Sequence, residues 1–157
     1  MCNPRLAYVR KKLAAGWQFL RANAPTEPDD DGLAERGHAK CDDFVRRYHE
    51  LGGRVTAGTD VGAVPFIVPG FSLHDEIAML VGAGLSPSSA INAATIEAAK
   101  ALRIDQETGS VEPGKCADLV ILDGDPLVDN RNLGRISTAV RAGTIHDSEE
   151  PLSTAAS

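Results

Sequence analysis

The sequence contains few cysteines and few aromatic residues. Only three of its 157 residues are cysteines, and they form no Cys-x-x-Cys pair. This number and spacing suit neither a disulfide framework nor a zinc ribbon, so we interpret the cysteines as reduced thiols. Aromatic residues make up 4% of the chain. We therefore expect a core built from Ala, Val, Ile and Leu, and no aromatic platform for stacking the bases of single-stranded nucleic acid.

Long hydrophobic runs and an excess of positive charge are also missing. No apolar run approaches the roughly 20 residues that a membrane-spanning helix needs. The first residues lack the basic-then-apolar order of a secretory signal, so we expect a cytoplasmic protein without membrane partners. The chain has 16 Lys and Arg against 22 Asp and Glu, a net charge of -6. This balance argues against nucleic acid as a partner, because phosphate binding needs a basic surface.

Several short catalytic motifs are absent as well. The chain has no P-loop, no G-x-G-x-x-G and no G-x-S-x-G, which leaves phosphate cradling, dinucleotide binding and a serine-hydrolase site unsupported. Its four histidines form neither H-x-H nor H-E-x-x-H. His38 and Cys41 have helical i,i+3 spacing and could bind a metal together with His49. Nothing fixes a fourth ligand, so we favour ordinary helix positions for all three.

Two acidic segments invite comparison with calcium sites. Residues 24–32 combine prolines, acids and a glycine, and residues 123–126 read Asp-Gly-Asp-Pro. Neither segment continues with the ligand spacing of a calcium loop. We expect a solvated surface loop over 24–32 and a turn over 123–126.

Apolar periodicity predicts four helices, over residues 4–23, 33–51, 72–83 and 87–102. Ser72 and Ser86 are the expected caps of the last two helices, and Gly52-Gly53 is the expected stop of the second. The stripes expected to face the core are Leu6, Val9, Leu13, Trp17 and Leu20 in the first helix and Cys41, Phe44, Val45, Tyr48 and Leu51 in the second.

Short β-branched runs bounded by turn residues predict strands over 54–59, 109–111, 117–122 and 136–143. The strand over 54–59 ends directly at Asp60, followed by Val61-Gly62. In a parallel α/β barrel, active sites lie at the carboxyl ends of strands, although an Asp in this position can equally well cap a loop. His74 begins the acidic run His74-Asp75-Glu76, where helix capping is the simpler role and a nearby polar site would make His74 or Glu76 available.

The order of these segments closely resembles the C-terminal part of metal-dependent amidohydrolases, nearest the imidazolonepropionase-related branch. The resemblance covers about residues 42–143. Its segments are Gly58-Thr59-Asp60, then residues 72–76, 80–87 and 90–95, and then the run 109–126, which reads GSVEPGKCADLVILDGDP.

The resemblance implies an α/β fold, namely the C-terminal fragment of a (β/α)8 TIM barrel plus strands of a small β-sandwich. It makes 54–59 the eighth barrel strand and Asp60 a metal ligand that also accepts a proton from metal-bound water and passes it to the departing amine. His74, Val61 and Gly62 become candidate substrate-binding residues. The implied cofactor is a divalent metal, zinc, in the complete enzyme. The family's histidine ligands have no counterpart in this chain, so we expect no tightly bound metal on the chain alone.

We therefore expect barrel residues over 1–103, sandwich strands over 104–146 and a disordered tail over 147–157. A complete relative would hydrolyse a C–N bond in a small amide, cyclic amide or dipeptide-like substrate. A non-catalytic α/β remnant that acts as an interaction module is the alternative. In either case the unpaired strand edges predict self-association.

Overall fold

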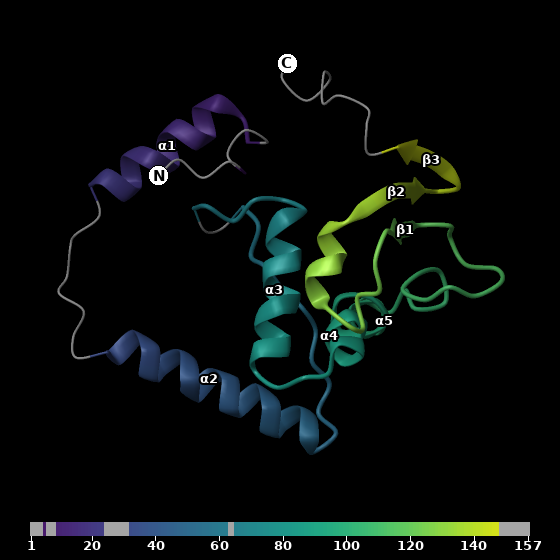
Figure 1. Ribbon diagram of the computed structural model, residues 1–157, viewed down its shortest axis with the longest axis horizontal. Helices are drawn as coiled ribbons and strands as arrows, with labels where there is room; N and C mark the ends of the chain where they lie inside the picture. Colours follow the sequence, from purple (N-terminus) through teal and green to yellow (C-terminus); the bar gives the residue numbers. More distant parts are fainter. Residues whose placement is uncertain (1–4, 6–8, 24–31, 63–64, 148–157) are drawn as a thin grey trace.

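The computed structural model describes residues 5, 9–23, 32–62 and 65–147, and shows a helical part followed by a small sheet (Figure 1). Helices α3, α4 and α5 lie together, with the strands to one side of them. None of the helices in these residues has both the length and the apolar character needed to cross a membrane. In chain order the elements are α1 (Lys11–Ala22), α2 (Leu33–Glu50), α3 (Phe71–Gly82), α4 (Pro87–Ala94), α5 (Ile96–Leu102), β1 (Leu119–Leu122), the 3-10 helix η2 (Asn130–Gly134), β2 (Ile136–Arg141) and β3 (Thr144–Asp147).

The main core lies between α3 and α4. Its buried residues are Ile77, Leu80, Leu85, Ala90 and Ala93. The two alanines of α4 allow that helix to approach α3 closely. Val45 of α2 and Val55 and Ala57 of the segment before α3 pack against this cluster, so the core holds the residues that precede Asp60 next to α3 and α4.

Helix α1 packs through a second and smaller cluster. Ala14, Trp17 and Val68 are buried there, and the rings of Trp17 and Phe66 lie 5.8 Å apart. The expected stripe is wrong for Leu13 and Leu20, which are 49% and 55% exposed. The helix also begins at Lys11 and not at residue 4. The reason is that, among the described residues, α1 packs against the segment from Phe66 to Phe71, which covers the side of the helix that carries Ala14 and Trp17.

Helix α2 has the expected bounds to within one residue and ends before Gly52, whose φ of 82° continues the chain in the left-handed region. Its expected buried face is wrong. Phe44 and Tyr48 stack on each other but are 68% and 47% exposed, and Leu51 is 88% exposed. Only Val45 of that face packs against the core, because α2 contacts its neighbours along one narrow line.

The start of α3 differs from the expectation. The helix begins at Phe71, after Gly70 with φ 80°, and the Ser72 side chain does not cap it. Instead the Val68 N–H donates to Ser72 Oγ (2.9 Å) and the Ser72 N–H donates to the Val68 carbonyl (3.0 Å). Both residues are buried. This reciprocal pair satisfies buried polar groups and fixes the chain where it enters α3.

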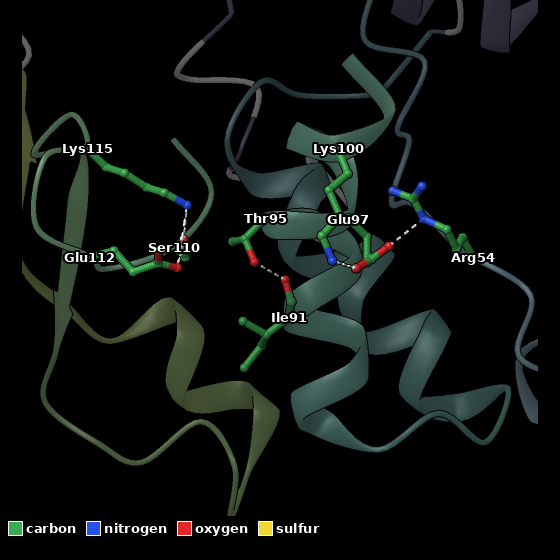
Figure 2. A network of polar contacts seen from close by, with 8 residues as sticks. All are labelled: Arg54, Ile91, Thr95, Glu97, Lys100, Ser110, Glu112 and Lys115. Carbon is green, nitrogen blue, oxygen red and sulfur yellow. Dashed lines mark hydrogen bonds and ion pairs between the residues drawn. The ribbon is translucent and has the colours of Figure 1, made fainter. Parts of the chain in front are cut away.

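The predicted cap of α4 is confirmed, since the Ser89 N–H donates to Ser86 Oγ (3.1 Å) and Pro87 opens the helix. The single helix expected over 87–102 is wrong, because it breaks at Thr95 with φ -126° and ψ -96°. There Thr95 Oγ1 donates to the Ile91 carbonyl (2.8 Å; Figure 2). A threonine hydroxyl that bonds back one turn competes with the helical backbone pattern, which accounts for two short helices.

The sheet is antiparallel with the order β1-β2-β3. Strands β1 and β2 confirm that strands form at these two places, but they are shorter than the runs expected over 117–122 and 136–143. Strand β3 was not predicted. It follows a two-residue turn at Ala142 and Gly143, with φ of 48° and 79°. Two positive φ values are typical of the type I′ hairpin turn, for which Ala-Gly is a weaker signal than Asn-Gly.

The strand expected over 109–111 is wrong, because these residues form a bend held by side chains. Ser110 Oγ donates to Glu112 Oε1 (2.6 Å), and Lys115 Nζ contacts both residues (Figure 2). The hydrogen bond from Ser110, followed by the charge of Lys115, lowers the pKa of Glu112. Polar contacts within the loop thus replace strand pairing.

Candidate functional site

Residues 54–59, which lead to Asp60, are extended but unpaired. Val55, Ala57 and Thr59 are half-buried, and the residues between them are exposed. This alternation is that of a strand with one face against a core. The strand expected here is nevertheless not formed, because no neighbouring strand among the described residues receives its backbone hydrogen bonds. We name residues 54–59 the extended segment.

Three contacts fix the extended segment along its length. At its start, Arg54 Nε donates to Glu97 Oε2 (2.8 Å), in the middle the Ala57 N–H donates to the Ala93 carbonyl (3.0 Å), and near its end the Gly58 N–H donates to Glu76 Oε1 (3.4 Å). Figure 2 shows the Glu97 carboxylate between Arg54 and Lys100. The hydrogen bond from Lys100, and then that from Arg54, lowers the pKa of Glu97.

Asp60 follows the extended segment in the left-handed region, with φ 51°. Aspartate tolerates this conformation better than most residues do. The side chain is exposed, and its carboxylate makes no hydrogen bond or ion pair with the described residues. Val61 is 48% exposed and Gly62 has φ 94°. The turn therefore exposes a carboxylate that no described residue pairs with.

Helix α3 brings Glu76 into contact with the end of the extended segment. Glu76 Oε1 accepts a hydrogen bond from Gly58, two residues before Asp60. Asp75 is paired with Arg5 on the outside of the helix. The His74 Nδ1 atom is buried and has no hydrogen-bond partner among the described residues. Glu76 was only an open possibility from sequence, although its spacing of four from the buried Ser72 and Leu80 could have placed it on the core side.

The described residues do not by themselves fit a metal ion. No group of three or more His, Cys, Asp and Glu side chains within 9–23, 32–62 and 65–147 is placed to hold one. His38 and Cys41 are exposed on α2, and His49 is half-buried there. Asp60 offers one carboxylate, whereas a zinc site takes three or four ligands. Any metal bound at Asp60 needs ligands from elsewhere.

The acidic turn at 123–126 is structural. Asp125 Oδ1 accepts a hydrogen bond from the Leu127 N–H (2.8 Å), and Asn132 Nδ2 donates to the Asp125 carbonyl (2.9 Å). These contacts close the turn and tie it to η2, which confirms the predicted turn. Residues 24–31 of the acidic segment expected over 24–32, and residues 148–157 of the tail expected over 147–157, lie outside the described residues. Asp147 is the last residue of β3, so the tail does not begin there.

Comparison with known proteins supports the resemblance. The profile of the amidohydrolase family matches residues 30–147. An imidazolonepropionase from Symbiobacterium thermophilum is 43% identical over 85 residues, which is 50% of this chain and 18% of that protein. Adenine deaminase 4 from Rhizobium meliloti is 37% identical over 107 residues, 66% of this chain and 17% of that protein. A solved bottromycin amidohydrolase structure is 27% identical, with a TM-score of 0.67 over 94% of this chain and 32% of that chain.

These matches also bear on the fold class. The chain spans less than a fifth of the length of the two curated relatives, and about a third of the solved structure. The structure is accordingly a partial α/β unit with a small antiparallel sheet. The expected fold class, a fragment of a TIM-barrel enzyme with strands of the adjoining small domain, is confirmed by the structural match.

Proposed function

Because the chain belongs to the amidohydrolase family, we propose that it is the C-terminal portion of a hydrolase that cleaves C–N bonds in small molecules. The observation that carries this proposal is the place of Asp60 within the matched residues 30–147. It stands directly after the extended segment, exposed and without a partner among the described residues. The names of the relatives, imidazolonepropionase, adenine deaminase and an amidohydrolase, support carbon–nitrogen chemistry.

The proposed role of Asp60 is proton transfer. A carboxylate near an attacking water can accept its proton and then donate that proton to the departing nitrogen, acting first as general base and then as general acid. Asp60 is exposed and pairs with no Lys or Arg of the described residues, so its lone pairs are available for this task. His74, Val61 and Gly62 are the proposed substrate-binding residues, because α3 and the turn after Asp60 carry them.

A divalent metal, zinc in the proposed complete enzyme, would lower the pKa of the attacking water. Its other ligands would have to be histidines from outside the described residues, since these residues hold no complete set. We expect calorimetric titration of this chain with zinc to show no stoichiometric site of sub-micromolar affinity. A tight site that disappears in Asp60→Asn would contradict this expectation and reveal an unforeseen set of ligands.

The proposed activity is tested by assaying the chain with zinc or manganese against a panel of amides, cyclic amides and dipeptides. Turnover that a chelator removes and that Asp60→Asn abolishes supports catalysis. Glu107→Gln is the matched control, because Glu107 is exposed and its carboxylate has no partner among the described residues.

A second experiment asks where the missing ligands come from. The DNA upstream of the Met1 codon should encode an H-x-H at a strand end, then a lysine or glutamate, and then two separate histidines. A hydrolytic metal site needs such groups to hold the ion while one position stays open for water. An unrelated gene upstream, with no separate chain supplying the histidines, would defeat the catalytic proposal.

The second candidate function is a non-catalytic interaction module. The observation that favours it is exposed apolar surface, since Ile121 and Ile145 of the sheet are 51% and 67% exposed. Together with the unpaired extended segment, this surface would favour self-association. Tight self-association in light scattering, together with an upstream region that encodes none of the missing histidines, would support the module and count against catalysis.

A further inference from the structure

The contact between α3 and the extended segment involves a residue without an assigned role. Glu76 lies on α3, half-buried, with one oxygen 3.4 Å from the Gly58 nitrogen. Apolar packing between α3 and the extended segment agrees with this contact. Ala57, next to Gly58, packs against the cluster that contains Ile77, next to Glu76. Side-chain packing and the hydrogen bond thus place the same two stretches of chain against each other.

Asp60 has no contact of its own to hold it. Its carboxylate is unpartnered among the described residues, and the Val55, Thr56 and Thr59 backbone groups bond to none of these residues either. Of the three contacts that fix the extended segment, the bond from Gly58 to Glu76 lies closest to Asp60. The direction in which the turn at Asp60 leaves the segment therefore depends on Glu76 more than on any other side chain described.

The helix backbone at Glu76 is held in place on both sides. The reciprocal hydrogen bonds between Val68 and Ser72 fix the first turn of α3, and Ser72 lies one turn before Glu76. Leu80, one turn after Glu76, is buried in the main core. The backbone of Glu76 is therefore fixed, so the orientation of its side chain decides whether the hydrogen bond to Gly58 forms.

We propose that Glu76 is a positioning residue that holds the Gly58 backbone and thereby sets the place of Asp60. Glu76 acts through the Gly58 amide and does not itself react. This inference rests on the proposed function only for the catalytic role of Asp60, since the contact between Glu76 and Gly58 exists whether or not the chain is catalytic. Substitution of Glu76 should loosen the end of the extended segment and leave its start, at Arg54 and Glu97, in place.

The test is site-resolved amide hydrogen exchange of the full chain without substrate. Glu76→Ala should speed exchange at Gly58 by about fivefold, the effect of losing one modest hydrogen bond. Glu76→Gln keeps the accepting oxygen and should restore a rate within twofold of the wild type. Glu76→Asp keeps the charge but withdraws the oxygen by one methylene, and should exchange fast. Glu107→Ala is the matched control and should leave Gly58 unchanged.

The Glu76→Asp and Glu76→Gln variants preserve most of the side chain. Their exchange rates at Gly58 therefore test whether Glu76 holds the Gly58 backbone even if Glu76→Ala fails to fold. An unchanged Gly58 rate in Glu76→Asp, or equal acceleration in Glu76→Asp and Glu76→Gln, would overturn the proposal. Because no substrate is present, these outcomes are independent of the activity panel. Inactivity of the chain in that panel would leave the role of Glu76 untouched.

Discussion

The helical part and the sheet of this chain are stabilised in different ways. The described residues include ten buried apolar side chains, all at or before Ala99, and eight of them form two clusters. No described residue after Ala99 is buried. The strands are joined by regular backbone pairing, yet their apolar side chains Val120, Ile121 and Ile145 are 58%, 51% and 67% exposed. Backbone pairing shapes the sheet, but little apolar burial stabilises it.

This difference predicts which region would be stabilised most by a partner. One face of the sheet carries Leu119, Ile121, Val140 and Ile145, which the strand register brings side by side. We name these four residues the apolar sheet face. A natural protein rarely leaves such a face open to water, so the sheet is the region whose stability should depend most on additional chain. The cluster between α3 and α4, by contrast, is buried by residues of the described chain itself.

The strongest test of this comparison removes one side chain from each region. Leu80, 8% exposed, lies in the main core, so Leu80→Ala should lower the free energy of unfolding by about 2 to 5 kcal/mol. Ile121→Ala on the sheet should change it by under about 1 kcal/mol, because the side chain is already half in water. Urea titration with equal slopes measures both. Similar losses for the two variants would show that the sheet carries a core of its own.

Trp17 tests whether α1 belongs to the stable part. It is 7% exposed and packs on Val68 and Phe66, and a buried tryptophan contributes about 3 kcal/mol or more. Because α1 touches little else, Trp17→Ala should release α1 alone. Protease cleavage within residues 9–23 should become faster, while the urea concentration at the midpoint of unfolding of the rest of the chain should not change. Phe19→Ala, on the exposed side of α1 at 68%, is the control. A lowered midpoint for the whole chain would place α1 within the main folding unit.

The local signals in the sequence predicted much of this fold. Ser86-Pro87 opens α4, and Gly52 follows α2, because caps and stops depend on residues close in the chain. The break at Thr95 and the exposure of Phe44 and Leu51 could not be predicted in the same way. Both depend on which faces find a tertiary neighbour, and periodicity says only which faces are apolar.

The candidate site was predicted only in part. The place of Asp60 after an extended run was visible in the order of Thr59, Asp60 and Gly62, since turn residues follow β-branched ones. The contact between Glu76 and Gly58 joins residues 18 apart in the chain, and no local pattern encodes it. The missing strand pairing of 54–59 has the same origin, because a strand needs partners that the described residues do not supply.

The comparison of the helical part with the sheet also predicts which surface drives self-association. If the apolar sheet face drives it, Ile145→Lys should shift the chain towards monomer in light scattering, because burying a lysine in an apolar interface is costly. His146→Lys places the same side chain on the opposite face of β3, where it should have little effect. Both positions are exposed, so neither change should unfold the sheet. Equal effects of the two variants would locate the association elsewhere, for example at the extended segment.

The smallest expected effect concerns Glu97, where the helical part holds the start of the extended segment. Its pKa is lowered by Lys100 and Arg54, so the folded state binds this proton less readily than the unfolded state. The stabilisation is therefore complete above the unfolded pKa of about 4.3 and is lost as the pH falls through the lower folded value.

Glu97→Gln should be less stable than the wild type at pH 7, and the difference should vanish towards pH 3. Glu107→Gln, which removes an unpartnered carboxylate, should show no such convergence. A difference between wild type and Glu97→Gln that stays constant from pH 7 to pH 3 would mean that the ion pairs of Glu97 do not stabilise the fold, leaving Ala57 and Gly58 as the contacts that hold the extended segment.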